Sequence, residues 1–198
     1  MRARAVVACL ALLPAGCVLK HSAPARLYVL QAVARGPQDL AGDAPRGDLG
    51  VQRVSIPAWM DRAEITARLG PGEIVPDPLA RWGEPFARGI QRVVTENLAA
   101  LLPERRVVAA PFAVRQAVDR RLDLAITECA RQPDGSVLLE ARWAILGQDG
   151  AAIAQRRSSH RQDAGHSAEG TVSATSALLA LLSGEIAAAV REAPEVTK

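Results

Sequence analysis

The chain has 198 residues, of which 49% are hydrophobic and 23% charged, the composition of a single globular domain with its own core. Only six residues are aromatic, which is too few for a surface that stacks nucleic-acid bases, so we expect no nucleic-acid partner. The net charge of +3 falls to +1 when Arg2 and Arg4 leave with a segment that we expect to be removed, and so small a charge does not steer a polyanion.

Residues 1–16 have the features of a bacterial export signal peptide. Arg2 and Arg4 form a positive start, an apolar run follows over residues 5–13, and a small Ala-Gly pair precedes Cys17. The run is too short to cross a bilayer as a helix, which takes about 20 residues. A buried N-terminal helix is the alternative, and we disfavour it because nothing caps the segment and its charges stand only at the start.

Residues 13–17 resemble the lipobox of bacterial lipoproteins, in which a small pair precedes a cysteine that is joined to diacylglycerol before the signal is removed. The chain matches this pattern at the small pair and at Cys17, and departs from it at Pro14, where an aliphatic residue is usual. The resemblance implies a covalent diacylglycerol on Cys17, with acyl chains such as palmitate, and a lipidated tether over residues 17–25. Val18 stands where an aspartate would resemble an inner-membrane retention signal, so we expect the outer membrane of a Gram-negative host.

The cysteines agree with this processing. Cys9 leaves with the signal and Cys17 is consumed by the lipid, so Cys129 is the remaining thiol and no intramolecular disulfide can form in the mature chain. A catalytic thiol needs a neighbouring base, and the three histidines stand in polar, loop-like stretches. We therefore expect Cys129 to be a buried structural residue.

The first part of the domain alternates short strands with turns. Residues 31–48 are rich in Gly, Pro, Ala and Asp and lack periodicity, which predicts a surface loop that is partly disordered. A Gly-Pro-Gly turn follows at residues 70–72. The expected strands are residues 26–30, 50–56, 66–69 and 73–75.

The clearest periodicity in the chain predicts an α-helix over residues 84–102. Apolar side chains recur every three to four positions from Phe86 to Leu102, which places them on one side of the helix. Pro85 is tolerable in a first helical turn, and Pro103 cannot prolong the helix. We expect the apolar side to lie on a sheet.

The opposite side of this helix is expected to face water. It carries Arg88, Gln91, Arg92 and Glu96, with Glu84 to Arg88 and Arg92 to Glu96 as pairs of opposite charge at i,i+4 spacing. A membrane-surface helix is the alternative, and we disfavour it because such a helix has a basic polar face rather than one of mixed charge.

The second half of the chain is typical of a β-meander followed by a helix. Turn signals stand at residues 133–135 and 148–150, and residues 159–165 are polar. Ser167 can cap a last helix over residues 168–192, which has an apolar stripe and many alanines. The expected strands are residues 106–110, 121–129, 137–146 and 151–158.

These elements predict an α/β two-layer sandwich. Its sheet is mixed, largely antiparallel and of about six or seven strands, and the helices over residues 84–102 and 168–192 pack on one face. Residues 26–193 form a single domain, and residues 194–198 form a loose tail.

Three stretches together resemble the paraquat-inducible protein C (PqiC) family, the auxiliary lipoproteins of ABC-type and MCE-type transport systems. The stretches are residues 56–65, residues 81–102, and residues 139–143 with 183–188. The resemblance covers nearly the whole chain from Cys17. It departs at Trp59, Ala63 and Gly83, where tyrosine, proline and alanine are usual in the family.

The resemblance implies a periplasm-facing, outer-membrane-anchored lipoprotein that is an accessory subunit of an MCE/ABC-type intermembrane lipid transport system. Its expected partner is a periplasm-spanning MCE-domain subunit, and a homo-oligomer is a further option. The alternative is a lipoprotein that itself binds and carries a lipid in a pocket between sheet and helices. The chain is expected to support envelope integrity in either case.

Trp59, Asp61 and Arg62 are the candidate partner-docking residues, because an aromatic residue beside an arginine is a common interface anchor. The alternative is that Trp59 packs in the core while Asp61 and Arg62 close a local bend. Glu84 is a further candidate for partner contact, and its alternative role is to stabilise the start of the first helix through its charge.

The densest basic cluster is Arg156, Arg157, His160 and Arg161. A lipid-headgroup contact is conceivable there, and a solvated strand end is the interpretation that we favour. The sequence has no HExxH metal motif, P-loop, dinucleotide-binding glycine turn or GxSxG elbow. We therefore expect no enzyme, no metal and no cofactor besides the lipid on Cys17, with an unrecognised periplasmic hydrolase as a remote alternative.

Overall fold

The computed structural model describes residues 24–36, 47–113 and 118–193. The predicted signal peptide, Cys17 and most of the tether lie outside the described residues, as does the predicted tail at residues 194–198. The structure therefore describes most of the predicted domain over residues 26–193, but not the predicted lipid anchor.

The described chain forms one mixed eight-stranded sheet and two helices. Four strand pairings are parallel and three are antiparallel, but the antiparallel ladders of β6 with β7 and of β7 with β8 are by far the longest. The elements in chain order are β1 (Arg26–Tyr28), β2 (Asp48–Val51), β3 (Glu64–Gly70), β4 (Glu73–Trp82), α1 (Phe86–Leu101), β5 (Arg106–Ala109), β6 (Arg120–Arg131), β7 (Ser136–Leu146), β8 (Ala152–Asp163) and α2 (Ala168–Glu192).

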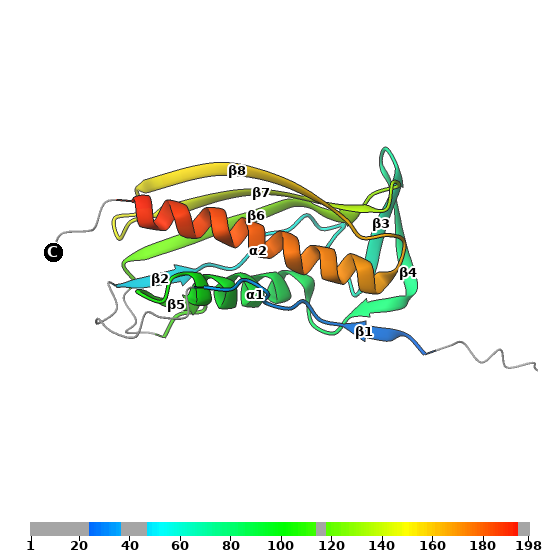
Figure 1. Ribbon diagram of the computed structural model, residues 1–198, viewed down its shortest axis with the longest axis horizontal. Helices are drawn as coiled ribbons and strands as arrows, with labels where there is room; N and C mark the ends of the chain where they lie inside the picture. The colour runs from blue at the N-terminus through cyan, green and yellow to red at the C-terminus, as the bar shows by residue number, and fades with distance from the viewer. Residues whose placement is uncertain (1–23, 37–46, 114–117, 194–198) are drawn as a thin grey trace, which may run out of the picture.

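Both helices lie on the same face of the sheet, with α2 running across β6, β7 and β8 and α1 beside β2 and β5 (Figure 1). The apolar side chains of the strands point toward the helices, and residues such as Glu140 and Arg142 are exposed on the opposite face. The predicted two-layer α/β sandwich is confirmed. Its sheet has eight strands rather than six or seven.

The strand β6 joins the two parts of the sheet. Along one edge it pairs with β7 over nearly its whole length. Along the other edge it pairs with β2 near its start, with Ser55 near its middle and with β3 at its end. Its alternate residues Leu122, Leu124 and Ile126 are almost fully buried under the helices.

Two strands extend further than their sequence pattern predicts. β4 continues to Trp82 although it contains Pro76 and Pro78, because β1 pairs only with its last three residues and leaves the edge beside the prolines free. β8 continues to Asp163 because its polar residues pair with β7 from Glu140 back to Ser136. Tertiary pairing overrides local preference in both places.

The strand predicted over residues 50–56 is shorter and starts earlier than expected. β2 covers residues 48–51, and all four of these are buried because β2 pairs with both β5 and β6. Beyond β2 the pairing with β6 continues through the backbone bond from Gln52 N–H to the carbonyl of Leu122 and through the isolated bridge of Ser55 to Ala125. The alternating pattern failed here because α1 covers one face of β2 while Phe112 and Val118 lie against Gly50 on the other, so neither face is solvated.

The helix α1 confirms the predicted apolar face, with Phe86, Ile90 and Leu98 buried. Pro85 is its N-cap rather than a member of its first turn. Gln91 does not face water as predicted. Its side-chain amide donates to the carbonyl oxygens of Val51, Gln52 and Ala110 at 3.0–3.2 Å and so ties the helix to the ends of β2 and β5.

Residues 31–36, the start of the predicted surface loop, lie bonded against both helices together with Leu30, the last residue of the predicted first strand, which in fact ends at Tyr28. Leu30 is 2% exposed. The backbone N–H of Gln31 donates to Ser176 Oγ at 3.2 Å, and that of Ala34 donates to Asn97 Oδ1 at 3.0 Å. We call residues 30–36 the strap. Residues 37–46 of the predicted loop lie outside the described residues, and its last residue, Asp48, begins β2.

The helix α2 begins at the predicted cap, where Ser167 Oγ accepts from Gly170 N–H at 2.9 Å. Among the described residues it is the one helix long and apolar enough to cross a membrane, and most of that stretch is buried in the domain core. At its other end, buried Arg120 donates to the carbonyl oxygens of Val190 and Ala193. A cation at a helix C-terminus also interacts favourably with the helix dipole.

We predict that Arg120→Ala lowers the free energy of unfolding by about 3 kcal/mol, because the buried carbonyl of Val190 and the part-buried carbonyl of Ala193 lose a charged donor. Urea denaturation followed by circular dichroism measures the change. The control Arg88→Ala removes an exposed arginine from α1 and should stay within about 0.5 kcal/mol of the parent. Equal losses in the two variants would contradict a special role for Arg120.

Candidate docking surface

The predicted docking residues lie on a turn over residues 57–62, between Ser55 and β3. Met60 N–H donates to the carbonyl of Pro57 at 2.9 Å, and Arg62 N–H donates to that of Met60 at 2.9 Å. Met60 is 2% exposed and anchors the turn in the core, whereas Asp61 and Arg62 are exposed. The turn therefore presents these two charges to solvent, and it also makes the local bend of the alternative interpretation.

Trp59 is half-buried, with its ring packed partly on the core and partly under Arg68. The guanidinium carbon of Arg68 lies 4.8 Å from the ring centroid, within the range of a cation–π contact. Trp59 therefore packs partly on the core, and the arginine that covers its ring is Arg68 rather than Arg62. Its role in docking stays a prediction.

Arg68 is held over the ring by Glu128 of β6. Its Nε and Nη2 donate to the same oxygen, Glu128 Oε2, at 2.9 and 2.6 Å, and this bonding raises the pKa of Arg68 above its ordinary value. Glu128 is 8% exposed, and its other oxygen has no hydrogen-bond partner among the described residues. Residues Trp59, Arg68 and Glu128 thus form one cluster that links the turn to β3 and β6.

Sequence reasoning missed Arg68 and Glu128 because they are 60 positions apart and neither belongs to a local motif. One signal was available. Glu128 continues the alternation of Leu122, Leu124 and Ile126, so a carboxylate stands at a position where the pattern predicts a buried side chain. A buried carboxylate requires a donor, and the candidate donors are arginines on neighbouring strands.

Arg62 is not a free charge, because it takes part in an ion-pair network around Glu64. Arg62 Nε lies 3.2 Å from one carboxylate oxygen of Glu64, and Arg81 Nη2 lies 3.7 Å from the other. A backbone hydrogen bond and the bond from Arg62 lower the pKa of Glu64. The backbone N–H of Asp61 donates to the carbonyl of Ala58 at 3.2 Å, but its carboxylate has no hydrogen bond or ion pair among the described residues, so it is the more available charge of the turn.

Glu84 has a different partner from the predicted one. It pairs with Arg92 at 2.6 Å instead of Arg88. Arg92 also pairs with Glu96 at 3.3 Å, as predicted, and donates to the carbonyl of Leu30 in the strap at 2.8 Å. Glu84 thus helps to hold the strap on α1, and no recorded interaction among the described residues joins it to the turn.

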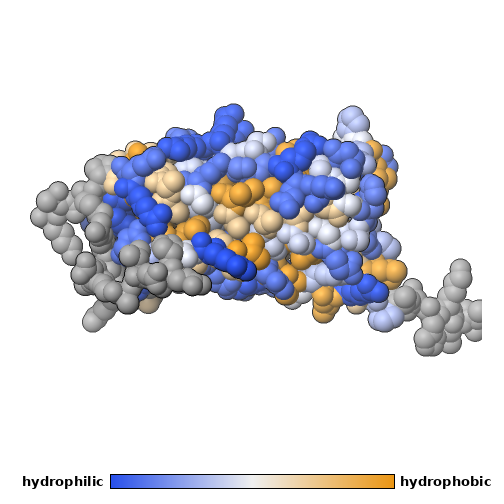
Figure 2. Space-filling model, in the orientation of Figure 1, coloured by the Kyte–Doolittle hydropathy of each residue, from blue (hydrophilic) through white to orange (hydrophobic). Residues whose placement is uncertain are grey.

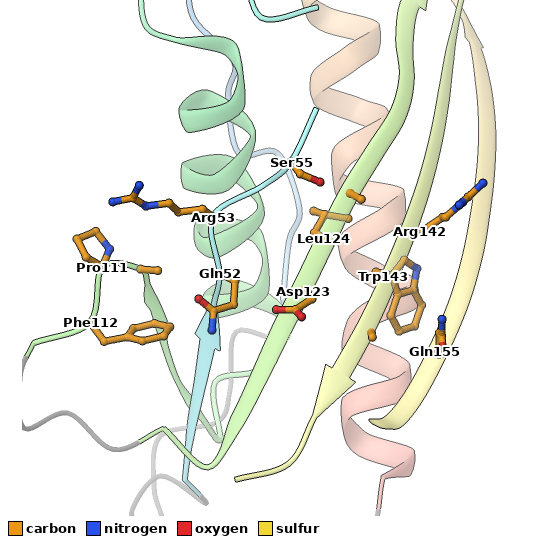
Figure 3. A pocket seen from close by; sticks show the side chains of 13 residues that line it. Gln52, Arg53, Ser55, Pro111, Phe112, Asp123, Leu124, Arg142, Trp143 and Gln155 are labelled. Atoms are coloured by element: carbon orange, nitrogen blue, oxygen red, sulfur yellow. The ribbon is translucent and has the colours of Figure 1, made fainter. Parts of the chain in front are cut away.

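The sheet face that the helices leave uncovered carries an open groove of about 660 Å³ (Figure 3). Pro111 and Phe112 lie on one side, Asp123 lies near the middle, and Arg53 and Arg142 point toward opposite sides. The two guanidinium groups therefore do not converge on a common anion. Sequence analysis missed this groove because its lining comes from five separate segments of the chain.

The basic cluster on β8 is largely neutralised by acidic partners. Arg156 lies 3.2 Å from Glu192, and Arg161 lies 2.7 Å from Asp134. His160 Nε2 lies 3.1 Å from Glu185 Oε1. These contacts favour a solvated, internally paired strand over a lipid-headgroup site.

Ser158, His160 and Glu185 come together but lack the arrangement of a catalytic triad. Glu185 stands between the other two, since one of its oxygens accepts from Ser158 Oγ and the other lies beside His160. A triad requires the histidine between the nucleophile and the acid. Ser158 Oγ also accepts from Trp143 Nε1 at 2.9 Å. The cluster therefore connects β7, β8 and α2 through side-chain contacts.

Cys129 is buried, as predicted, at 6% exposure. Burial raises the pKa of its thiol to about 12, so the reactive thiolate is absent at neutral pH. Among the described residues no group of three histidine, cysteine or acidic side chains could hold a metal ion.

Comparisons with known proteins agree on family and fold. The model of a protein family described as ABC-type transport auxiliary lipoprotein component matches residues 28–187. The crystal structure of an uncharacterized protein superposes with a TM-score of 0.70 at 18% identity, over 85% of this chain and 99% of that one. A Xanthomonas campestris protein of family DUF330 superposes with a TM-score of 0.67 at 16% identity, over 85% and 98%. No curated protein matches the chain.

We predict that Arg68→Met costs more stability than Glu128→Gln. The first variant leaves the buried Glu128 carboxylate without its donors and should cost about 3 kcal/mol, whereas the second keeps an acceptor of the same shape and should cost about 1 kcal/mol. Urea denaturation of both variants measures the difference. The reverse order would show that Arg68 and not Glu128 is the constrained member of the pair.

We predict that Cys129 resists thiol reagents in the folded protein and reacts on unfolding, which an absorbance assay with Ellman's reagent measures. The ordinary pKa of a cysteine thiol is 9.0 and that of buried Cys129 is about 12, so the folded state keeps the proton longer. The associated stability is present below pH 9 and is lost as the pH rises toward 12. Cys129→Ala should lack this part of the alkaline loss, and rapid labelling of folded protein would contradict the burial.

Proposed function

Because the chain belongs to the family of ABC-type transport auxiliary lipoprotein components, we propose that it is the outer-membrane-anchored accessory of an MCE-type intermembrane lipid transport system. The observation that carries the proposal is the family match from residue 28 to residue 187, which spans β1 to most of α2. The finer assignment to an MCE system rests on the sequence resemblance to the PqiC family. The protein acts by binding and assembly rather than by catalysis.

The proposed anchor is a diacylglycerol on Cys17, joined to the domain by the tether at residues 17–25. Each buried methylene adds about 0.8 kcal/mol of membrane affinity, and one acyl chain alone binds only marginally. Two or three chains on one cysteine give a stable attachment. The domain then stays at the periplasmic surface of the outer membrane.

The turn at residues 57–62 is the proposed docking site for the MCE-domain partner. It offers half-buried Trp59 under Arg68, with exposed Asp61 and Arg62 beside it. An aromatic ring with a neighbouring arginine and a rim of charge is the composition of an interface hot spot. Glu84 pairs with Arg92, which in turn bonds the carbonyl of Leu30. We assign it the role of holding the strap on α1 rather than of contacting the partner.

The lipid-carrier alternative receives less support. Between sheet and helices the described residues form one continuous core, which includes Trp143, Leu178 and Leu182 at 2% exposure or less. A cleft of about 270 Å³ lies between the β3 and β4 hairpin and the start of α2. It falls below the roughly 300–1,000 Å³ of ordinary ligand pockets.

We predict that an MCE-domain protein co-purifies with C-terminally tagged protein from gently solubilised envelopes, as identified by mass spectrometry. The double variant Asp61→Ala/Arg62→Ala should recover several-fold less partner, because the exposed charges of the turn are gone. Cys17→Ser should leave a folded domain that no longer fractionates with the outer membrane and recovers no partner.

The control is Arg88→Ala/Glu192→Ala, which removes one exposed charge of each sign, from α1 and from the far end of α2. It should recover as much partner as the parent. Loss in both double variants would argue against the turn as the docking site. Recovery of bound lipid without any partner protein would favour the carrier, and outer-membrane fractionation of Cys17→Ser would refute the anchor.

A further inference from the structure

Exposed large hydrophobic residues gather at one end of the domain. Five of the seven that the described residues contain lie on or next to β1, β3 and β4. The most exposed of all is Leu27 on β1, at 70%. The five are Leu27, Val29, Leu69, Val75 and Leu79.

Three of these residues surround the point where the chain enters the domain. β1 runs parallel to β4, with Arg26 opposite Ala80 and Leu27 opposite Arg81. Leu79 precedes Ala80 on β4, so it lies beside the point where the tether ends and β1 begins. Val29 follows β1 directly and lies against Gly83. We call Leu27, Val29 and Leu79 the exit patch.

The figures place this patch at one tip of the molecule. β1 and β4 lie at the end opposite to the C-terminus of α2 (Figure 1). Figure 2 shows hydrophobic atoms at this same end, in the region of β1 and β4. The patch therefore lies at the end of the domain that carries β1 and β4, and its three side chains are 46–70% exposed.

The length of the tether limits how far this end can be from the anchor. Nine residue steps separate Cys17 from Arg26, and a fully extended chain covers at most about 3.3–3.6 Å per step, or roughly 30 Å. The exit patch begins at the next residue. Of all parts of the domain, this end is the one that a lipid on Cys17 keeps nearest to the bilayer.

The charges around the patch are neutralised in pairs. Arg26 lies 2.9 Å from Glu169, and Arg81 lies 3.7 Å from Glu64. The hydroxyl of Tyr28 also donates to Glu169 at 2.8 Å. An apolar patch with a paired, nearly neutral rim fits the interface of a bilayer, where aliphatic side chains insert between headgroups without a net field to oppose them.

From these observations we infer that the exit patch rests in the surface of the bilayer that holds the Cys17 lipid and orients the domain with β1 and β4 toward the membrane. The inference rests on the proposed lipid anchor. It adds an orientation, with the end of α2 at Glu192 and the turn at residues 147–150 directed into the periplasm. The turn at residues 57–62, joined to Arg81 through Glu64, then lies close to the membrane, where a lipid conduit would end.

A site-specific fluorophore tests the contact. Purified lipidated protein with Leu79→Cys is labelled with an NBD group and incorporated into vesicles of phosphatidylethanolamine and phosphatidylglycerol. Labelling is specific because Cys129 is buried and Cys17 carries the lipid. The matched control is Leu181→Cys, which is similarly exposed at 53% against 46% but lies in the middle of α2. Leu27→Cys serves as a second position in the patch.

The expected result is a blue shift of emission and quenching by nitroxide-labelled lipids at residues 79 and 27, with neither change at residue 181. Polar emission at all three positions in protein that floats with the vesicles would overturn the inference and leave the anchor intact. Equal shifts at residues 79 and 181 would overturn the orientation. A shift at residue 79 that needs an added partner protein would assign the patch to that protein. Failure of the protein to float would overturn the anchor and this inference together.

Discussion

The structure depends on the pairing of β6 along both of its edges. One edge binds β7 and, through it, β8, while the other receives β2, Ser55 and β3 in succession. The N-terminal strands are therefore attached to the meander by backbone hydrogen bonds at three points of one strand. The buried alternate residues of β6 then bring both parts of the sheet under α1 and α2. Backbone groups left unpaired in this core would be costly, which makes the arrangement specific.

This constraint also positions the candidate docking surface. The turn at residues 57–62 is tied to β6 at both ends, through Ser55 before it and β3 after it. Glu128 of β6 then draws Arg68 over Trp59. A surface supported by a strand and a buried carboxylate is more rigid than an ordinary loop, and rigidity reduces the entropy that binding a partner would cost.

The layers of the described domain are joined by packing and by one polar cluster. The space between sheet and helices is filled by side chains, and Ser158, His160 and Glu185 connect β7, β8 and α2. The exit patch and the turn at residues 57–62 both belong to the half that contains β1, β3 and β4, so the proposed membrane contact and the proposed partner contact lie at one end of the domain.

The sequence by itself determined α1, α2, the meander from β6 to β8 and the burial of Cys129, because periodicity and caps depend on residues close together in the chain. It also identified Trp59, Asp61 and Arg62 as candidates for partner docking, and that role stays a prediction. Only the tertiary structure decided the length of β4, the position of the strap, the pairing of Glu84 with Arg92 and the Arg68 and Glu128 bond. Each of these depends on a partner brought near by folding, and no local pattern of residues records which distant side chain or strand that partner is.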